Sequence, residues 1–183
     1  MVVLGVDPGS QRCGYGVVAR TGARLSRIAS GVLVPGRLPT AERLGRLLDQ
    51  LSQLLGEGGI EAVAIETAFC GRSPRSALAL GQARGVALAV AGRAGLPVFE
   101  YAPAEVKRAF TGNGRAEKEQ MVRTARALFG VEARLADEAD ALAIAVCHLA
   151  RRAGTLPIRL PSTARRTSAL RPSVRRFREV AVP

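Results

Sequence analysis

The order of the apolar runs along this 183-residue chain constrains its fold more than any other feature. Turn-forming residues separate the first three short runs, which cover residues 2–6, 14–20 and 25–34. This arrangement predicts an antiparallel meander of three strands. Leucines at helical spacing follow over residues 40–55, and Gly58-Gly59 ends that helix before a further strand at residues 62–66.

The second half of the chain alternates between helical and strand patterns. We predict helices over residues 75–94, 103–110, 116–129 and 137–152. A fifth strand is expected at residues 98–101. Three strands followed by alternating helices and strands predict an α/β fold, in which a mixed five-stranded sheet carries helices on both faces.

Composition divides the chain into a folded domain, residues 1–156, and a basic tail, residues 157–183. The tail is rich in Pro, Ser and Arg and poor in large apolar residues, which predicts disorder. It holds seven Arg and one Glu, so it carries half of the formal net charge of +12. Because the folded part is also basic, the charge favours a polyanionic partner such as a nucleic acid.

The chain shows no pattern of export or membrane insertion. No basic segment precedes the first apolar run, and the longest apolar stretch, residues 85–92, is too short to cross a bilayer. The three cysteines are scattered and form no CxxC pair. We therefore expect a cytoplasmic protein with reduced cysteines and no membrane partner.

Two of the predicted buried strands end on a carboxylate. Asp7 follows the first apolar run and Glu66 ends the fourth, and strand ends are where sheet proteins commonly bind ligands. Asp7 with Pro8 and Gly9 also fits an ordinary turn. Glu66 is harder to explain in that way, because Glu is depleted in strands and does not favour turns. Glu66 is therefore the stronger functional candidate of the two.

The last predicted helix begins with an acidic cluster. Residues three apart share a helical face, so Asp137 and Asp140 point together while Glu138 points about 100° away. Acidic residues also favour the first turn of any helix. However, the residues after Asp140 are almost all apolar, so Asp140 begins a buried segment. A carboxylate there needs a partner, and a metal ion would provide one.

Four carboxylates could therefore meet at two strand ends and one helix start: Asp7, Glu66, Asp137 and Asp140. Carboxylates without His or Cys suit Mg²⁺ or Mn²⁺, and such a cluster can hold two ions about 4 Å apart for phosphoryl chemistry. The single histidine, His148, lies too far along its helix to join them. We expect it in the core or on the surface.

Only two of the 27 Lys and Arg residues are lysines, Lys107 and Lys118, and both lie in one segment. A lysine ammonium is a compact charge that can approach a scissile phosphate more closely than a planar guanidinium can. Chance also explains two lysines in one segment. Their scarcity elsewhere nevertheless favours a role close to a reacting phosphate.

Five blocks of sequence, in order over residues 2–150, resemble the RuvC family of bacterial Holliday junction resolvases. The blocks are GVDPGSQRCGYGVV, IETAF, SALALGQARG, APAEVKRAFTGNGRAEKEQMV and DEADALAIA. The resemblance implies a ribonuclease-H-like fold and a homodimer that nicks two opposed strands of a four-way DNA junction in recombination and repair. It also implies partnership with the RuvA and RuvB branch-migration proteins.

The resemblance also implies roles for particular residues. Divalent metal, expected as two Mg²⁺ per subunit with Mn²⁺ as a substitute, would bind Asp7, Glu66, Asp137 and Asp140. Lys107 and Lys118 would act as catalytic and DNA-binding cations, and Phe69 would insert into the DNA. We expect further DNA contacts from Arg72 and Arg75.

Three alternatives stay open at the level of sequence. Sugar-kinase and actin-like ATPases also begin with a strand, an Asp and a glycine turn, but they need further glycine-rich phosphate loops, and no second such loop is evident here. A related nuclease acting on other branched DNA or RNA would share the fold, as would a non-catalytic junction-binding protein. The presence of all four carboxylates favours a nuclease over a protein that only binds.

Overall fold

The computed structural model describes residues 1–67, 73–131 and 136–154. Its strands are β1 (Val2–Asp7), β2 (Cys13–Thr21), β3 (Arg24–Leu33), β4 (Ala62–Glu66) and β5 (Val98–Tyr101). Its helices are α1 (Thr40–Gly56), α2 (Pro74–Arg93), α3 (Pro103–Thr111), α4 (Lys118–Phe129) and α5 (Ala136–Arg152). All ten elements predicted from the sequence are confirmed, and each boundary lies within two residues of its predicted position.

The five strands form one mixed sheet in the order β3-β2-β1-β4-β5. β1, β2 and β3 make the predicted antiparallel meander. β4 runs parallel to β1, and β5 runs parallel to β4. Val6 of β1 lies opposite Ile65 of β4, so the residues that follow them, Asp7 and Glu66, end neighbouring strands at the same edge of the sheet.

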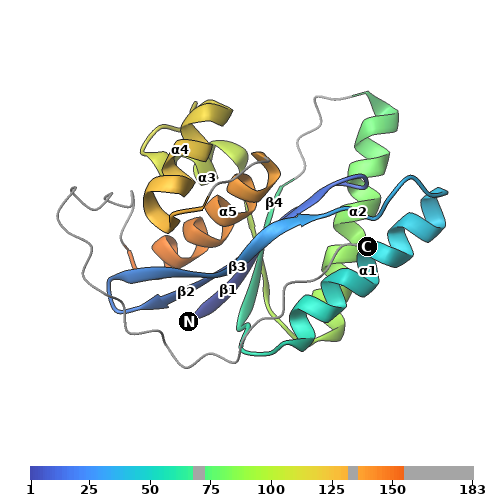
Figure 1. Ribbon diagram of the computed structural model, residues 1–183, viewed down its shortest axis with the longest axis horizontal. Helices are drawn as coiled ribbons and strands as arrows, with labels where there is room; N and C mark the ends of the chain where they lie inside the picture. Colours follow the sequence, from blue (N-terminus) through green and yellow to red (C-terminus); the bar gives the residue numbers. More distant parts are fainter. Residues whose placement is uncertain (68–72, 132–135, 155–183) are drawn as a thin grey trace.

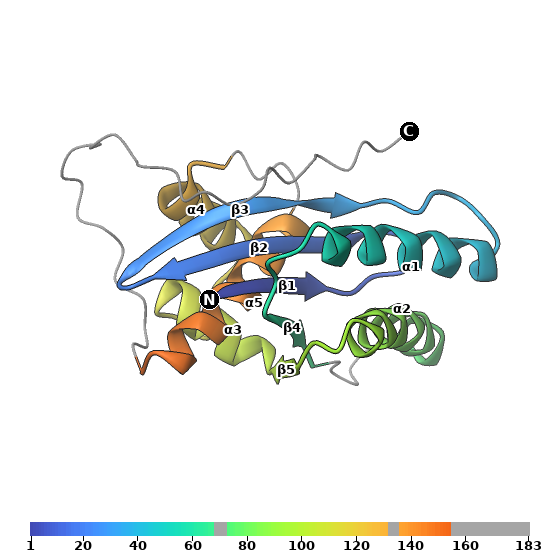
Figure 2. The same ribbon diagram turned by 90° about the horizontal axis from the view of Figure 1, so that it is seen from below.

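Helices cover both faces of the sheet, as Figures 1 and 2 show. Alternate side chains of each strand point to opposite faces. In β1, Val3 packs with the layer formed by α3, α4 and α5, whereas Leu4 and Val6 pack with the layer formed by α1 and α2. The predicted arrangement of helices on both faces is therefore confirmed, as a three-layer α/β/α structure.

Glycines of β1 and β2 allow α5 to lie directly on the sheet. A Cβ atom on Gly5 would overlap the carbonyl oxygen of Ala141, and one on Gly14 would overlap the carbonyl oxygen of Asp137. No larger residue fits at either position unless the helix moves away. Gly14 also pairs with Asp7 in the β1–β2 ladder. This close approach holds the first turn of α5 beside the end of β1.

The single histidine belongs to the core. His148 on α5 is fully buried, and its Nδ1 lies 2.7 Å from the hydroxyl oxygen of Tyr101. The Phe99 ring lies against it, with ring centroids 4.4 Å apart. Burial, with a smaller effect of Arg152, lowers the pKa of the imidazole and favours the neutral ring.

The predicted basic tail lies outside the described residues. In the three described ranges, every helix is too short or too polar to cross a bilayer.

Candidate active site

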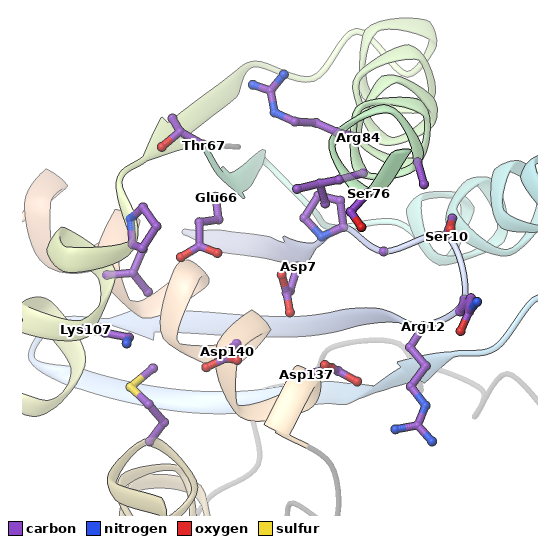
Figure 3. Close-up of a pocket in the computed structure, with 18 residues that line it drawn as sticks. Asp7, Ser10, Arg12, Glu66, Thr67, Ser76, Arg84, Lys107, Asp137 and Asp140 are labelled. Atoms are coloured by element: carbon purple, nitrogen blue, oxygen red, sulfur yellow. The ribbon is translucent and has the colours of Figure 1, made fainter. Parts of the chain in front are cut away.

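A cleft of about 900 Å³ lies at the edge of the sheet where β1 and β4 end (Figure 3). Its walls come from the segment after β1, the end of β4, α2 as far as Arg84, and the N-terminal parts of α3, α4 and α5. The four carboxylates predicted from the sequence all line it: Asp7, Glu66, Asp137 and Asp140. The fold thus gathers residues from opposite ends of the domain.

Each carboxylate reaches the cleft from the end of a regular element. Asp7 and Glu66 are the last residues of adjacent parallel strands. Asp137 and Asp140 share one face at the start of α5, and Figure 3 shows them near Asp7. Glu138 lies outside the cleft, as predicted, and its carboxylate accepts a hydrogen bond of 2.6 Å from the hydroxyl of Ser30.

Burial and mutual repulsion raise the pKa values of these carboxyl groups. Burial is the largest cause at Asp7, followed by the charges of Asp140, Glu66 and Asp137, and the pKa of Asp7 rises to about 8. Burial and then Asp140 raise the pKa of Glu66 to about 6. The pKa of Asp140 is also raised, chiefly by burial. Full ionisation of the cluster therefore requires positive charge nearby.

Both lysines act on this cluster, from two different helices. Lys107 of α3 lines the cleft and lowers the pKa of Glu66. Lys118 is exposed at the start of α4, and its charge lowers the pKa values of Asp7 and Asp140. The two lysines of the sequence thus lie within electrostatic reach of the carboxylates.

The donor set fits hard divalent cations. Among the described residues that line the cleft, the ionisable acids are all carboxylic acids, and neither His nor Cys is present. Mg²⁺ and Mn²⁺ prefer such oxygen ligands, and a cation would offset the repulsion that raises the pKa values. In the described ranges, no three Asp, Glu, His or Cys side chains are gathered tightly enough to surround one ion.

Of the other three residues predicted to bind DNA, the structure describes one, Arg75. Arg75 is exposed in the first turn of α2 and is not among the residues that line the cleft. Phe69 and Arg72 lie outside the described residues.

Sequence reasoning missed several polar residues of the cleft, namely Ser10, Arg12, Ser76 and Arg84. Arg84 of α2 forms an ion pair with Glu100 of β5, with Nη2 and Oε2 2.5 Å apart. The sequence does contain a signal for Arg84, because it is the single charged residue between Arg75 and Arg93.

A family model described as "Crossover junction endodeoxyribonuclease RuvC" matches residues 3–148. This chain belongs to the RuvC family. It is 69% identical over 157 residues to the RuvC of Anaeromyxobacter dehalogenans strain 2CP-C, a match that covers 86% of this chain and 85% of the relative. It is 49% identical over 154 residues to the RuvC of Chlorobaculum parvum, with 82% of each chain covered. The resemblance inferred from the five sequence blocks is confirmed.

Solved RuvC structures share the fold. The structure of Thermus thermophilus RuvC in complex with a Holliday junction substrate is 37% identical to this chain, with a TM-score of 0.77. That match covers 86% of this chain and 98% of the T. thermophilus chain. The yeast mitochondrial Holliday junction resolvase Ydc2, at 15% identity and a TM-score of 0.63, shares the fold alone. The fold is the predicted ribonuclease-H-like one.

Proposed function

We propose that this RuvC protein is a metal-dependent endonuclease that resolves Holliday junctions by nicking two opposed strands. The observation that carries the proposal is the convergence of four carboxylates in one cleft, beside two lysines. Family membership supports the substrate, because T. thermophilus RuvC has been solved with a Holliday junction. The test compares cleavage of a synthetic four-way junction with that of duplex, fork and RNA–DNA hybrid at equal salt. Equal cleavage of all four substrates would contradict the proposal.

Asp7, Glu66, Asp137 and Asp140 would hold the metal, as two Mg²⁺ per subunit or Mn²⁺ in their place. Metal held there would supply a lowered pKa for a bound water, the nucleophile, and positive charge for the leaving 3′ oxygen. The protein supplies rigid placement, because strand ends and the first turns of a packed helix carry all four ligands. Lys107 and Lys118 offset negative charge on the phosphoryl oxygens.

The raised pKa of Asp7 predicts that the metal-free protein loses stability as pH rises. In the unfolded chain Asp7 ionises near its ordinary value of 3.8, whereas burial and its neighbours raise its folded pKa to about 8. Between these values the unfolded state binds fewer protons, so the free energy of unfolding falls as pH increases. We expect Tm in EDTA to fall from pH 4 to pH 8, and Mg²⁺ to raise Tm most at pH 8.

The matched control for this prediction is Asp7→Asn, which removes the titrating group. Its Tm in EDTA should depend less on pH than that of the unmodified protein and should be higher at pH 8. If Tm depended on pH in the same way in both proteins, the surroundings of Asp7 would not raise its pKa.

The lysine proposal predicts that Lys107→Arg and Lys118→Arg cleave slowly but bind well. Each change keeps the charge and replaces a compact ammonium with a broad planar group. We expect single-turnover cleavage about tenfold slower or more, a loss of about 1.4 kcal/mol of transition-state stabilisation. Arg123→Lys, at an exposed position of α4, should have no effect. Unchanged rates in both Arg variants would mean that charge alone is needed.

We also propose that Phe69 inserts between bases at the crossover, with Arg72 and Arg75 contacting the backbone nearby. An aromatic ring can offset the few kcal/mol needed to unstack a base step. Phe69→Ala should bind junctions nearly as well as the unmodified protein and cleave them poorly, whereas Phe69→Trp should stay active. The fluorescence of a base analogue placed at the crossover should increase when the unmodified protein binds, but not when Phe69→Ala binds. An unchanged base signal together with a large loss of Tm would instead place Phe69 in the core.

The protein is further proposed to act as a homodimer, because two opposed strands call for two sites related by a two-fold axis. The outer face of α2 supports this, since Leu78 is 65% exposed there. Gly81 and Gly85 are exposed on the same helix, with nothing within 4 Å of an added Cβ, so a second helix could approach closely.

The proposed domain boundaries are residues 1–156 for the nuclease domain and 157–183 for a tail that binds polyanions. The family match, which ends at residue 148, is consistent with that division. We expect the protein to work in the cytoplasm with the RuvA and RuvB branch-migration proteins.

A further inference from the structure

Arg84 is a mostly buried cation whose hydrogen-bonding capacity is incompletely used. Its side chain is 20% exposed, and the structure pairs it with Glu100 through Nη2. Its Nε is buried and has no hydrogen-bond partner among the described residues. A guanidinium carries five N–H donors in a planar fork, and a buried donor without a partner is uncommon. The buried Nε is closed to an external acceptor, but Arg84 lines the cleft, so the terminal N–H groups that Glu100 does not occupy can meet an acceptor there.

The ion pair with Glu100 does not explain Arg84 as a stabilising device. Glu100 is 45% exposed on the edge strand β5, and ion pairs with such solvent-exposed carboxylates contribute about 0–1 kcal/mol. Burying most of a guanidinium opposes that small gain. An apolar residue would suit a purely structural position between α2 and β5 at least as well.

The position of Arg84 suggests what the missing acceptor is. Arg84 lines the same cleft as the carboxylates, whereas Glu100 is not among the lining residues. Figure 3 shows Arg84, Lys107 and Arg12 on different sides of the cleft, with the four carboxylates between them. A DNA backbone that crosses the carboxylates would meet the α2 side of the cleft at Arg84.

We propose that Arg84 binds a DNA phosphate next to the scissile one, through N–H groups of the guanidinium that Glu100 does not occupy. The inference rests on the proposed nuclease function. Two N–H groups of a guanidinium match two oxygens of a phosphate, which makes Arg suited to this contact and Lys less so. Such backbone contacts set the position of the DNA without reading its sequence.

The test compares Arg84→Gln with its matched control Glu100→Gln, which breaks the same ion pair from the other side. Junction binding is measured in EDTA, so that no cleavage occurs, over a series of salt concentrations. Arg84→Gln should weaken binding about tenfold and reduce the slope of log K against log salt by about 1. Glu100→Gln should bind as tightly as the unmodified protein, with an unchanged slope.

Two results would overturn the inference. One is an unchanged salt slope and affinity in Arg84→Gln; the other is an equal loss of binding in both variants, which would mean that the ion pair only supports the fold. If Arg84→Gln fails to fold, Arg84→Lys carries the test, with an expected loss of affinity of about threefold or more. If Arg84→Lys folds and binds the junction with unchanged affinity, the proposed contact between the planar guanidinium and a phosphate is contradicted. Failure of the nuclease proposal is separate, because it would appear as absent junction cleavage by the unmodified protein.

Discussion

Asp7→Asn and Asp140→Asn are each expected to slow junction cleavage by about 10³-fold or more, which corresponds to about 4 kcal/mol of lost transition-state stabilisation. Both residues line the cleft, and the charge of Asp140 helps to raise the pKa of Asp7. Junction affinity should change only a few-fold, because binding comes from the basic surface rather than from the carboxylates. Glu66→Gln should behave in the same way. Single-turnover cleavage and equilibrium binding of the same labelled junction measure the two quantities.

The matched control for these variants is Glu138→Gln. Glu138 belongs to the same acidic cluster at the start of α5, but it contacts Ser30 on β3 rather than the cleft. It should keep nearly the full rate. Normal cleavage by Asp7→Asn or Asp140→Asn would remove that residue from the active site, and a large loss in Glu138→Gln would mean that charge at the helix start matters more than position.

Gly14→Ala is expected to slow cleavage by about 10²-fold, because a misplacement of about 1 Å has effects of that size. The added Cβ would overlap the Asp137 carbonyl, so the first turn of α5 must move away from β1. Asp7 lies opposite Gly14 in the ladder, so the shift separates Asp137 from Asp7. Half-maximal cleavage should require more Mg²⁺, and overpacking should destabilise the fold by about 1–3 kcal/mol.

Gly45→Ala provides the control, because Gly45 lies in helix α1 with nothing within 4 Å of an added Cβ. This change should leave cleavage intact and stabilise the protein by about 0.5–1 kcal/mol. Cleavage by Gly14→Ala at the normal rate and the normal Mg²⁺ dependence would show that the close approach of α5 does not set the geometry of the site.

The sequence predicted the elements and the carboxylates well, because both leave local patterns. Apolar runs of period two or 3.6 mark strands and helices, and a charge that ends a buried run stands out against them. Glu66 and Asp140 were found in this way. Asp7 was less distinctive, since an Asp before Pro and Gly also fits a turn, and the parallel pairing of β1 with β4 is what places it beside Glu66.

Features that depend on contacts between distant elements could not be predicted in the same way. Gly14 appears in the sequence as an ordinary strand residue, and its importance depends on a helix that begins more than a hundred residues later. Arg84 looks like a solvent-exposed charge on a helix, and its burial depends on β5 and on the cleft. No local pattern contains that information.

The central claim is tested most directly by mapping the nicks made in one immobile four-way junction with each of its four strands labelled in turn. In the presence of Mg²⁺ the protein should nick two opposed strands at symmetry-related positions, and DNA ligase should seal the resulting duplexes without gap filling. The Asp7→Asn variant should give neither the paired nicks nor the ligated duplexes. Nicks confined to one strand, scattered along the duplex arms or equally frequent in Asp7→Asn would contradict the account.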